Sequence, residues 1–146
     1  MNGVAQILKG KASRVVHAIG PNDTVYDAVR KMAEHNIGAL LVMEGENIVG
    51  IVTERDYARK IVLADRSSKD TPVALIMTPQ VLCVSPQQTT KECMAIMTEN
   101  RVRHLPVMDN GRLIGLLSIG DLVKDIISEQ QFIIEQLEHY ISGTRG

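Results

Sequence analysis

The sequence has very few aromatic residues: they make up 3% of its 146 residues, and tryptophan is absent. Proteins that bind single-stranded nucleic acid stack the bases on aromatic side chains, and this chain can offer few. The formal net charge of −1 also provides no long-range attraction for a polyanion. We therefore expect no nucleic-acid partner.

Cysteine is scarce as well, with only Cys83 and Cys93 in the chain. Their spacing fits neither a disulfide framework nor a zinc site. Both lie in apolar stretches, so we expect them to be small buried hydrophobic side chains. No apolar run approaches the roughly 20 residues that span a bilayer, and no secretory signal is evident. We expect no membrane partner and a cytoplasmic location.

Motifs of catalysis are also missing. There is no glycine-rich phosphate loop of the G-x-x-x-x-G-K-[S/T] kind, and no pair of histidines or cluster of acids at ligand spacing. His17, His35 and His139 are scattered, and we assign them no role. The sequence predicts that the protein is not an enzyme, with a small nucleotide hydrolase as a minor alternative.

What the chain does contain is an internal repeat, and 45% apolar residues from which to build a core. The segment from Gly50 to Asp56 reads GIVTERD, and the segment from Gly115 to Asp121 reads GLLSIGD. The step between equivalent positions is 65 (121 − 56), and it holds without a gap from residue 21 to residue 121. Identities at this step include Thr24/Thr89, Met32/Met97, Leu40/Leu105, Val42/Val107 and Met43/Met108. A repeat at a fixed step is the signature of two copies of one structural unit.

Each copy reads as strand, helix, strand, strand, helix. In the first copy we expect strands at 15–19, 39–43 and 48–52, and helices that begin after Thr24 and Thr53. In the second we expect strands at 81–84, 105–108 and 113–117, and helices after Thr89 and Ser118. A small sheet with two helices is marginal alone, so the copies should pack on each other about a pseudo-two-fold axis. The fold class is α+β, with repeats at 1–65 and 73–127, a linker at 66–72 and a helical extension at 128–146.

The extension is apolar at a seven-residue spacing. Ile126, Ile133 and Tyr140 form one series, and Ile127, Ile134 and Ile141 form another. A helix with so wide an apolar face predicts an association surface, and we expect a homodimer. The alternative is that the helix folds back on its own chain.

The repeated hydroxyl and acid, Thr53 with Asp56 and Ser118 with Asp121, have two interpretations. The simple one is structural, because a hydroxyl caps a helix and an acid in the first turn suits the helix dipole. The functional one is a nucleotide site, because a helix start attracts anions and a carboxylate one turn on can accept both hydroxyls of a ribose. The recurrence of the pattern after two hairpin strands favours the second.

These motifs, with the Ile76-Met77-Thr78 lead-in and the segment from Arg101 to Asp109, resemble a tandem pair of cystathionine-β-synthase (CBS) domains. Such a pair is called a Bateman module, and the likeness, to freestanding bacterial-type members, covers roughly residues 5 to 127. The resemblance implies a sandwich of two repeats with two clefts, each able to bind an adenine nucleotide such as AMP, ADP, ATP or NAD. That nucleotide would be a regulatory ligand, and no catalytic cofactor is implied.

The resemblance also implies roles for residues. Asp56 and Asp121 would hold ribose hydroxyls, and Thr53 and Ser118 would lie at the ribose-phosphate edge. Arg55 would contact phosphate, a role that Gly120 cannot repeat.

Further positions match the family pattern in the second copy and in the lead-ins. Arg103 and His104 match a basic pair that faces phosphates, although basic residues beside a buried strand are often only solvated. Their first-copy equivalents are Gly38 and Ala39, so the copies differ in charge. The remaining expected contacts are Ser13 and Thr78 from the lead-ins, and the backbone of Ala18 and Cys83 at the adenine ring.

The predicted function is a regulatory, signal-transducing module that binds an adenosine compound and passes its state to a separate, unidentified effector protein. The alternative is a structural or interaction protein that binds no ligand and acts through its C-terminal helix.

Overall fold

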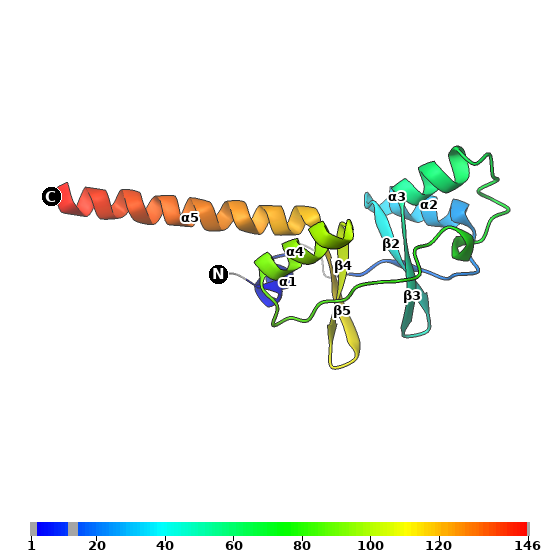
Figure 1. Ribbon diagram of the computed structural model, residues 1–146, viewed down its shortest axis with the longest axis horizontal. Helices are drawn as coiled ribbons and strands as arrows, with labels where there is room; N and C mark the ends of the chain where they lie inside the picture. Colours follow the sequence, from blue (N-terminus) through cyan, green and yellow to red (C-terminus); the bar gives the residue numbers. More distant parts are fainter. Residues whose placement is uncertain (1–2, 12–14, 146) are drawn as a thin grey trace. The chain divides into compact units, whose positions relative to one another are not determined.

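The computed structural model describes residues 3–11 and 15–145, with backbone only for 143–145. The chain forms two compact units (Figure 1). One is Val15–Leu82, and the other combines Met1–Arg14 with Cys83–Gly146. Two α+β units of matching design confirm the predicted fold class.

The Val15–Leu82 unit is built on a three-stranded sheet in the order β1-β2-β3, with β1 parallel and β3 antiparallel to β2. Helices α2 and α3 contact each other and the strands β2 and β3. The elements are β1 (Ala18–Ile19), α2 (Val25–His35), β2 (Ala39–Glu44), β3 (Asn47–Thr53), α3 (Glu54–Tyr57), the π-helical turn η1 (Ala58–Val62) and the 3-10 turn η2 (Val73–Leu75).

The second unit pairs β4 with β5 in an antiparallel hairpin. Its hairpin and that of the first unit carry a bulge at the equivalent place, after Val42 and after Val107. The elements are α1 (Val4–Gly10), α4 (Thr90–Asn100), β4 (His104–Asp109), β5 (Arg112–Ser118) and α5 (Ile119–Arg145).

Each unit has its own apolar core, to which equivalent faces of α2 and α4 contribute. On α2 the residues Val25, Ala28 and Met32 are buried. On α4 the equivalent Thr90, Cys93 and Met97 are buried. The helix starts are also as predicted, because the hydroxyls of Thr24 and Thr89 each accept a hydrogen bond from a backbone N–H of the first turn.

The lead-in segments are exchanged between the repeats. Val4, Ile7 and Leu8 of α1 belong to the core of the unit that contains the second copy. Val73 and Ile76, which precede the second copy, belong to the core of the unit that contains the first. The compact units therefore cut across the sequence boundaries predicted at residues 65 and 73.

Several local predictions need correction. Residues 4–10 form a helix that the sequence did not reveal. No strand forms at 81–84, where only Val84 bridges to Val107, and the strand expected at 15–19 shortens to Ala18–Ile19. The helix that follows Thr53 changes from α to π at Ala58.

The cysteines differ from each other. Cys93 is buried as predicted, but Cys83 is exposed. It adjoins Val84, whose side chain is buried. Val84 forms a parallel bridge with Val107, and because successive side chains alternate sides in such strand-like backbone, the Cys83 side chain faces solvent.

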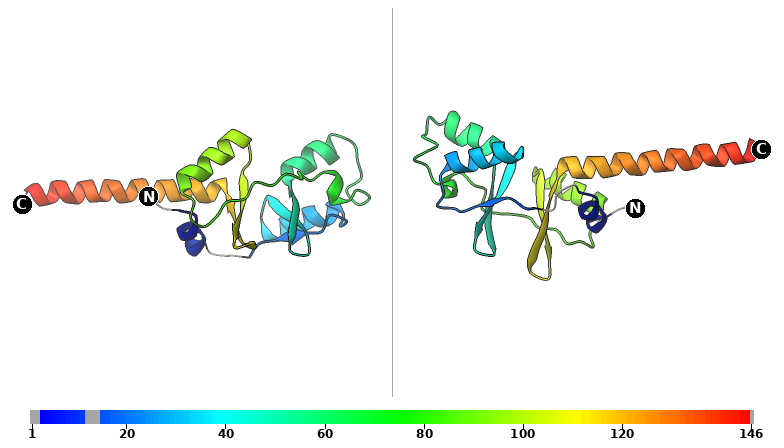
Figure 2. Two further views of the ribbon diagram at one scale, coloured as in Figure 1. Left: turned by 60° about the horizontal axis from the view of Figure 1, so that its bottom comes forward. Right: turned by 180° about the vertical axis from the view of Figure 1, so that it is seen from behind.

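Helix α5 continues well beyond α4 and the β4-β5 hairpin of its unit (Figure 2). Leu122, near its start, is fully buried, but large apolar side chains further along are exposed. The exposed ones are Val123, Ile127, Phe132, Ile133, Ile134, Leu137, Tyr140 and Ile141. Within the described part of the chain, no helix has the length and hydropathy of a membrane span.

Candidate functional site

The first-copy acid, Asp56, is fixed by a capping box at the start of α3. Its Oδ2 accepts hydrogen bonds from the Thr53 backbone N–H at 3.0 Å and from the Thr53 hydroxyl at 3.1 Å. The Asp56 N–H donates in return to Thr53 Oγ1 at 3.1 Å. On its other oxygen, Oδ1, the carboxylate pairs with Lys60 Nζ at 3.2 Å. The acid is thus held rigidly in one orientation.

Lys60 is itself anchored, because its ammonium also donates to the carbonyl oxygen of Ile76 at 2.8 Å. Ile76 belongs to the exchanged lead-in, two residues before Thr78. Thr78 pairs with Ile51 of β3 through two backbone hydrogen bonds, at 2.8 and 2.9 Å. The lead-in therefore lies along the same strand that ends in Thr53.

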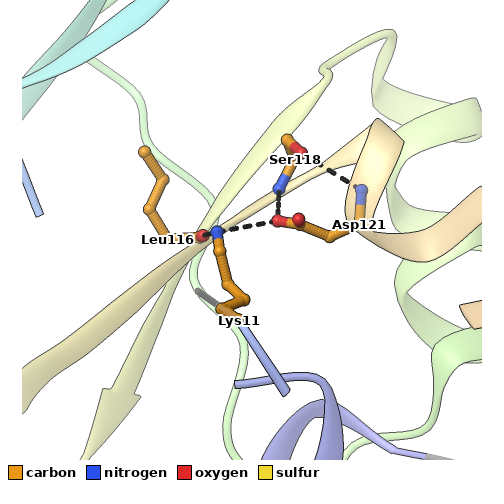
Figure 3. A network of polar contacts seen from close by, with 4 residues as sticks. All are labelled: Lys11, Leu116, Ser118 and Asp121. Atoms are coloured by element: carbon orange, nitrogen blue, oxygen red, sulfur yellow. Dashed lines mark hydrogen bonds and ion pairs between the residues drawn. The ribbon is translucent and has the colours of Figure 1, made fainter. Parts of the chain in front are cut away.

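The second-copy acid, Asp121, repeats this arrangement at the start of α5 (Figure 3). Its Oδ2 accepts a hydrogen bond from the Ser118 backbone N–H at 2.9 Å, and its own N–H donates to Ser118 Oγ at 3.2 Å. A lysine again pairs with the carboxylate, but here it is Lys11 from the lead-in, with Nζ 2.9 Å from Oδ2. The same ammonium donates to the carbonyl oxygen of Leu116 at 2.8 Å.

The pKa of Asp121 lies below its ordinary value. Partial burial alone would raise the pKa, but hydrogen bonds from Lys11 and Ser118, together with the Lys11 charge, outweigh it. The carboxylate is therefore ionised at neutral pH, as an acceptor of ribose hydroxyls must be.

His104 and Arg103 flank this acid from the start of β4. His104 pairs in register with Ser118, and the carbonyl oxygen of Arg103 accepts a hydrogen bond from the Ile119 N–H at 2.9 Å. Burial lowers the pKa of His104. The Asp121 charge opposes this shift, while the charges of Lys11 and Arg103 add to it. The charges of Asp121, Lys11 and Arg103 therefore all act around His104 on the second unit.

The other predicted site residues are placed as follows. Arg55 and Thr78 are exposed on the first unit, and Cys83 is exposed on the second. Ala18 lies on β1, where its carbonyl oxygen accepts a hydrogen bond from the Lys31 ammonium. Ser13 lies outside the described residues.

Lys11 and Lys60 are the polar partners that the sequence analysis did not find. Lys60 could have been recognised, because residues four apart face each other on a helix and it lies four positions after Asp56. Lys11 lies 110 residues from Asp121, and no local spacing connects them.

Comparison with known proteins identifies the fold. A family model of the CBS domain matches residues 4–63 and 73–128. The chain belongs to the CBS-domain family. The two matched segments correspond to the two copies, so it carries a pair of CBS domains, as the resemblance predicted.

Solved and curated relatives agree. A CBS-domain protein from Burkholderia ambifaria, to which a role in signal transduction is attributed, has a solved structure that matches this one with a TM-score of 0.85. The two sequences are 61% identical, and the match covers 88% of this chain and 96% of that one. The mitochondrial CBS-domain protein CBSX3 of Arabidopsis thaliana is 45% identical over 84% of this chain, but the match spans only 62% of its own length. A more distant CBS-CP12 protein from cyanobacteria, 27% identical over 82% of this chain and 69% of that one with a TM-score of 0.73, is hexameric.

Proposed function

We propose that this CBS-domain pair is a regulatory module that binds an adenosine-containing nucleotide of the AMP, ADP, ATP or NAD type and signals to a separate effector protein. The observation that carries this proposal is the matching pair of anchored acids. Asp56 and Asp121 both stand one turn into a helix, and each carboxylate is oriented by the residue that caps it. An oriented, ionised carboxylate is the group that binds the hydroxyls of a ribose.

Charge supports a phosphorylated ligand at the second copy. Lys11 and Arg103 outnumber Asp121 there, and His104 adds a proton acceptor beside them. A cluster with net positive charge favours an anion, and a helix start adds N–H donors. Among the described residues no group of histidine, cysteine and acidic side chains could hold a metal ion. CBS-domain pairs are generally regulatory, which fits binding better than chemistry.

Calorimetric titration with AMP, ADP, ATP, NAD and S-adenosylmethionine tests the proposal. At least one ligand should bind the wild type, and Asp121→Ala or Asp56→Ala should weaken it about tenfold or more, because a hydrogen-bonding charge is lost. Asp70→Asn is the matched control, since Asp70 is an exposed acid on a loop. Thermal melts without ligand would show that each variant folds.

Binding that survives both acid variants would contradict the proposed site. No binding of any of the five compounds by folded, nucleotide-free wild type would contradict the proposed function.

We also infer that α5 joins two copies of the chain into a homodimer. The exposed residues Ile127, Ile134 and Ile141 are seven apart, and Leu137 lies three after Ile134. This places isoleucine at heptad position a and leucine at position d, the composition that favours parallel two-stranded coiled coils. Gln130 takes the preceding d position, and a polar residue in such a seam sets the alignment of the helices at some cost in stability.

Light scattering coupled to gel filtration tests the dimer. The wild type should elute at twice the chain mass of 16.1 kDa, and Ile134→Asp should elute as a monomer. Glu135→Gln, which removes a charge at heptad position b, outside the seam, is the control and should stay dimeric. A monomeric wild type at tens of micromolar would contradict the inference.

A further inference from the structure

We propose that Lys11 is a specificity-determining residue of the second-copy site, and that it exchanges partners when a nucleotide binds. In the structure its ammonium pairs with Asp121. With ligand, ribose hydroxyls take its place on the carboxylate, and the ammonium pairs with a phosphate of the ligand. The inference rests on the proposed nucleotide function and adds a residue and a selectivity to it.

The geometry gives Lys11 access to the binding group. Its Nζ lies 2.9 Å from the Asp121 oxygen that also accepts from the Ser118 N–H, so lysine and ligand would compete for the same carboxylate. The two side chains remain 27% and 20% exposed, which leaves room for a ligand to approach. The hydrogen bond to the Leu116 carbonyl holds the ammonium at this place from a second side (Figure 3).

Electrostatics explains why the Lys11 ammonium would move from Asp121 to a phosphate of the ligand. A lone carboxylate repels a nucleotide phosphate, so a site that binds ribose through an acid needs a cation close by. Lys11 is that cation. Burial lowers the pKa of His104 most, and the charges of Lys11 and Arg103 add to this shift against the pull of Asp121. Lysine suits the role, because its compact charge lies on a flexible stem and can turn from one anion to the next.

The exchange predicts a selectivity. An uncharged nucleoside whose ribose takes the Oδ2 position of Asp121 displaces Lys11 and offers it nothing in return. A nucleoside monophosphate offers a new anionic partner. Lys11 should therefore weaken the binding of adenosine and strengthen that of AMP.

Titration of AMP and adenosine into an Asp56→Ala chain isolates the second-copy site. In that background, Lys11→Met should weaken AMP binding by about tenfold or more, the usual effect of losing a charge-assisted hydrogen bond. Adenosine should bind as well as before or more tightly. Lys11→Arg keeps the charge and should keep the preference for AMP. Lys9→Met is the matched control, because it removes a charge from an exposed position of the same segment.

The other possible outcomes of this titration contradict different parts of the proposal. If AMP and adenosine weaken equally and the melting temperature of Lys11→Met falls, Lys11 only docks the lead-in. If Lys11→Met changes the affinity for neither AMP nor adenosine, the proposed role of Lys11 is wrong. The same conclusion follows if AMP binds the wild type but not the Asp56→Ala chain. In both cases the proposed nucleotide binding stands. If wild type binds neither compound nor any other adenosine nucleotide, the proposed function itself fails.

Discussion

The two copies hold equivalent acids through lysines of different origin. Asp56 pairs with Lys60, one turn further along its own chain segment, whereas Asp121 pairs with Lys11, 110 residues away. The reason is visible at the position equivalent to Lys60, which is residue 125 (60 + 65) and carries an aspartate. Asp125 accepts a hydrogen bond from the Thr90 hydroxyl at 2.7 Å, so it serves the packing of α5 on α4. Equivalent acids in the two copies therefore each have a lysine partner, but the lysine comes from a different segment and pairs with a different carboxylate oxygen.

The copies also differ in the charge around these acids. Beside Asp56 the chain adds Glu54, whose carboxylate oxygen lies 2.9 Å from where a Cβ on Gly38 would be. The equivalents in the second copy are Ile119 and Arg103, so there an acid is lost and a cation gained. Arg55, whose equivalent is Gly120, acts in the opposite direction, so each copy has a cation that the other lacks.

The largest effect should come from the equivalent glycines Gly50 and Gly115. A Cβ on Gly50 would lie 2.9 Å from the backbone oxygen of Thr78 and 2.7 Å from Met77 Sδ. On Gly115 it would meet only the end of the Leu8 side chain, at 2.7 Å, which can turn away. Gly50→Ala should cost about 1–3 kcal/mol of unfolding free energy, as overpacking does, and Gly115→Ala clearly less. Urea denaturation of the two variants measures the difference, and equal losses would refute this account.

A smaller effect is expected at the ends of α2 and α4. Asn36 and Arg101, which are equivalent, both adopt the left-handed conformation, with φ of 53° and 54°. Asparagine tolerates it, but arginine does so at a cost that glycine avoids. Arg101→Gly should therefore raise the unfolding free energy by about 0.5–1 kcal/mol, whereas Asn36→Gly should change it little. Thermal melts would check this, and a lower melting temperature for Arg101→Gly would contradict it.

The smallest effect concerns pH. The pKa of His104 is lowered in the folded state by burial and by the Lys11 and Arg103 charges, against the pull of Asp121. The unfolded chain therefore binds more protons below about pH 6.5, and the folded state loses stability as pH falls from there to the folded pKa. His104→Ala, which copies Ala39 of the first repeat, should lose less stability between pH 7.5 and pH 5.5 than the wild type does. Urea midpoints at both pH values test this, and identical pH dependence would show that His104 contributes none of it.

Local chemistry accounts for what could be predicted from the sequence. The repeat, the caps at Thr24 and Thr89, the two hairpins and the buried faces of α2 and α4 all follow from residues within one turn or one strand of each other. So does the orientation of Asp56 and Asp121 by the residue three positions before each. Interactions of this range leave a periodicity or a spacing that can be read directly.

Contacts between residues far apart in the sequence account for the features that could not be predicted. The exchange of lead-ins places Val4 and Leu8 in one core and Val73 and Ile76 in the other, and it brings Lys11 to Asp121. The apolar surface that segment 4–10 covers belongs to residues far from it in the sequence. Its helix therefore did not stand out in the sequence. Pairing across 110 residues depends on which surfaces pack together, and packing leaves no fixed spacing along the chain. Two copies of a capped acid, and Lys60 one helical turn after the first of them, can be read from the sequence because their contacts are local. The pairing of Lys11 with Asp121 depends on how distant segments pack.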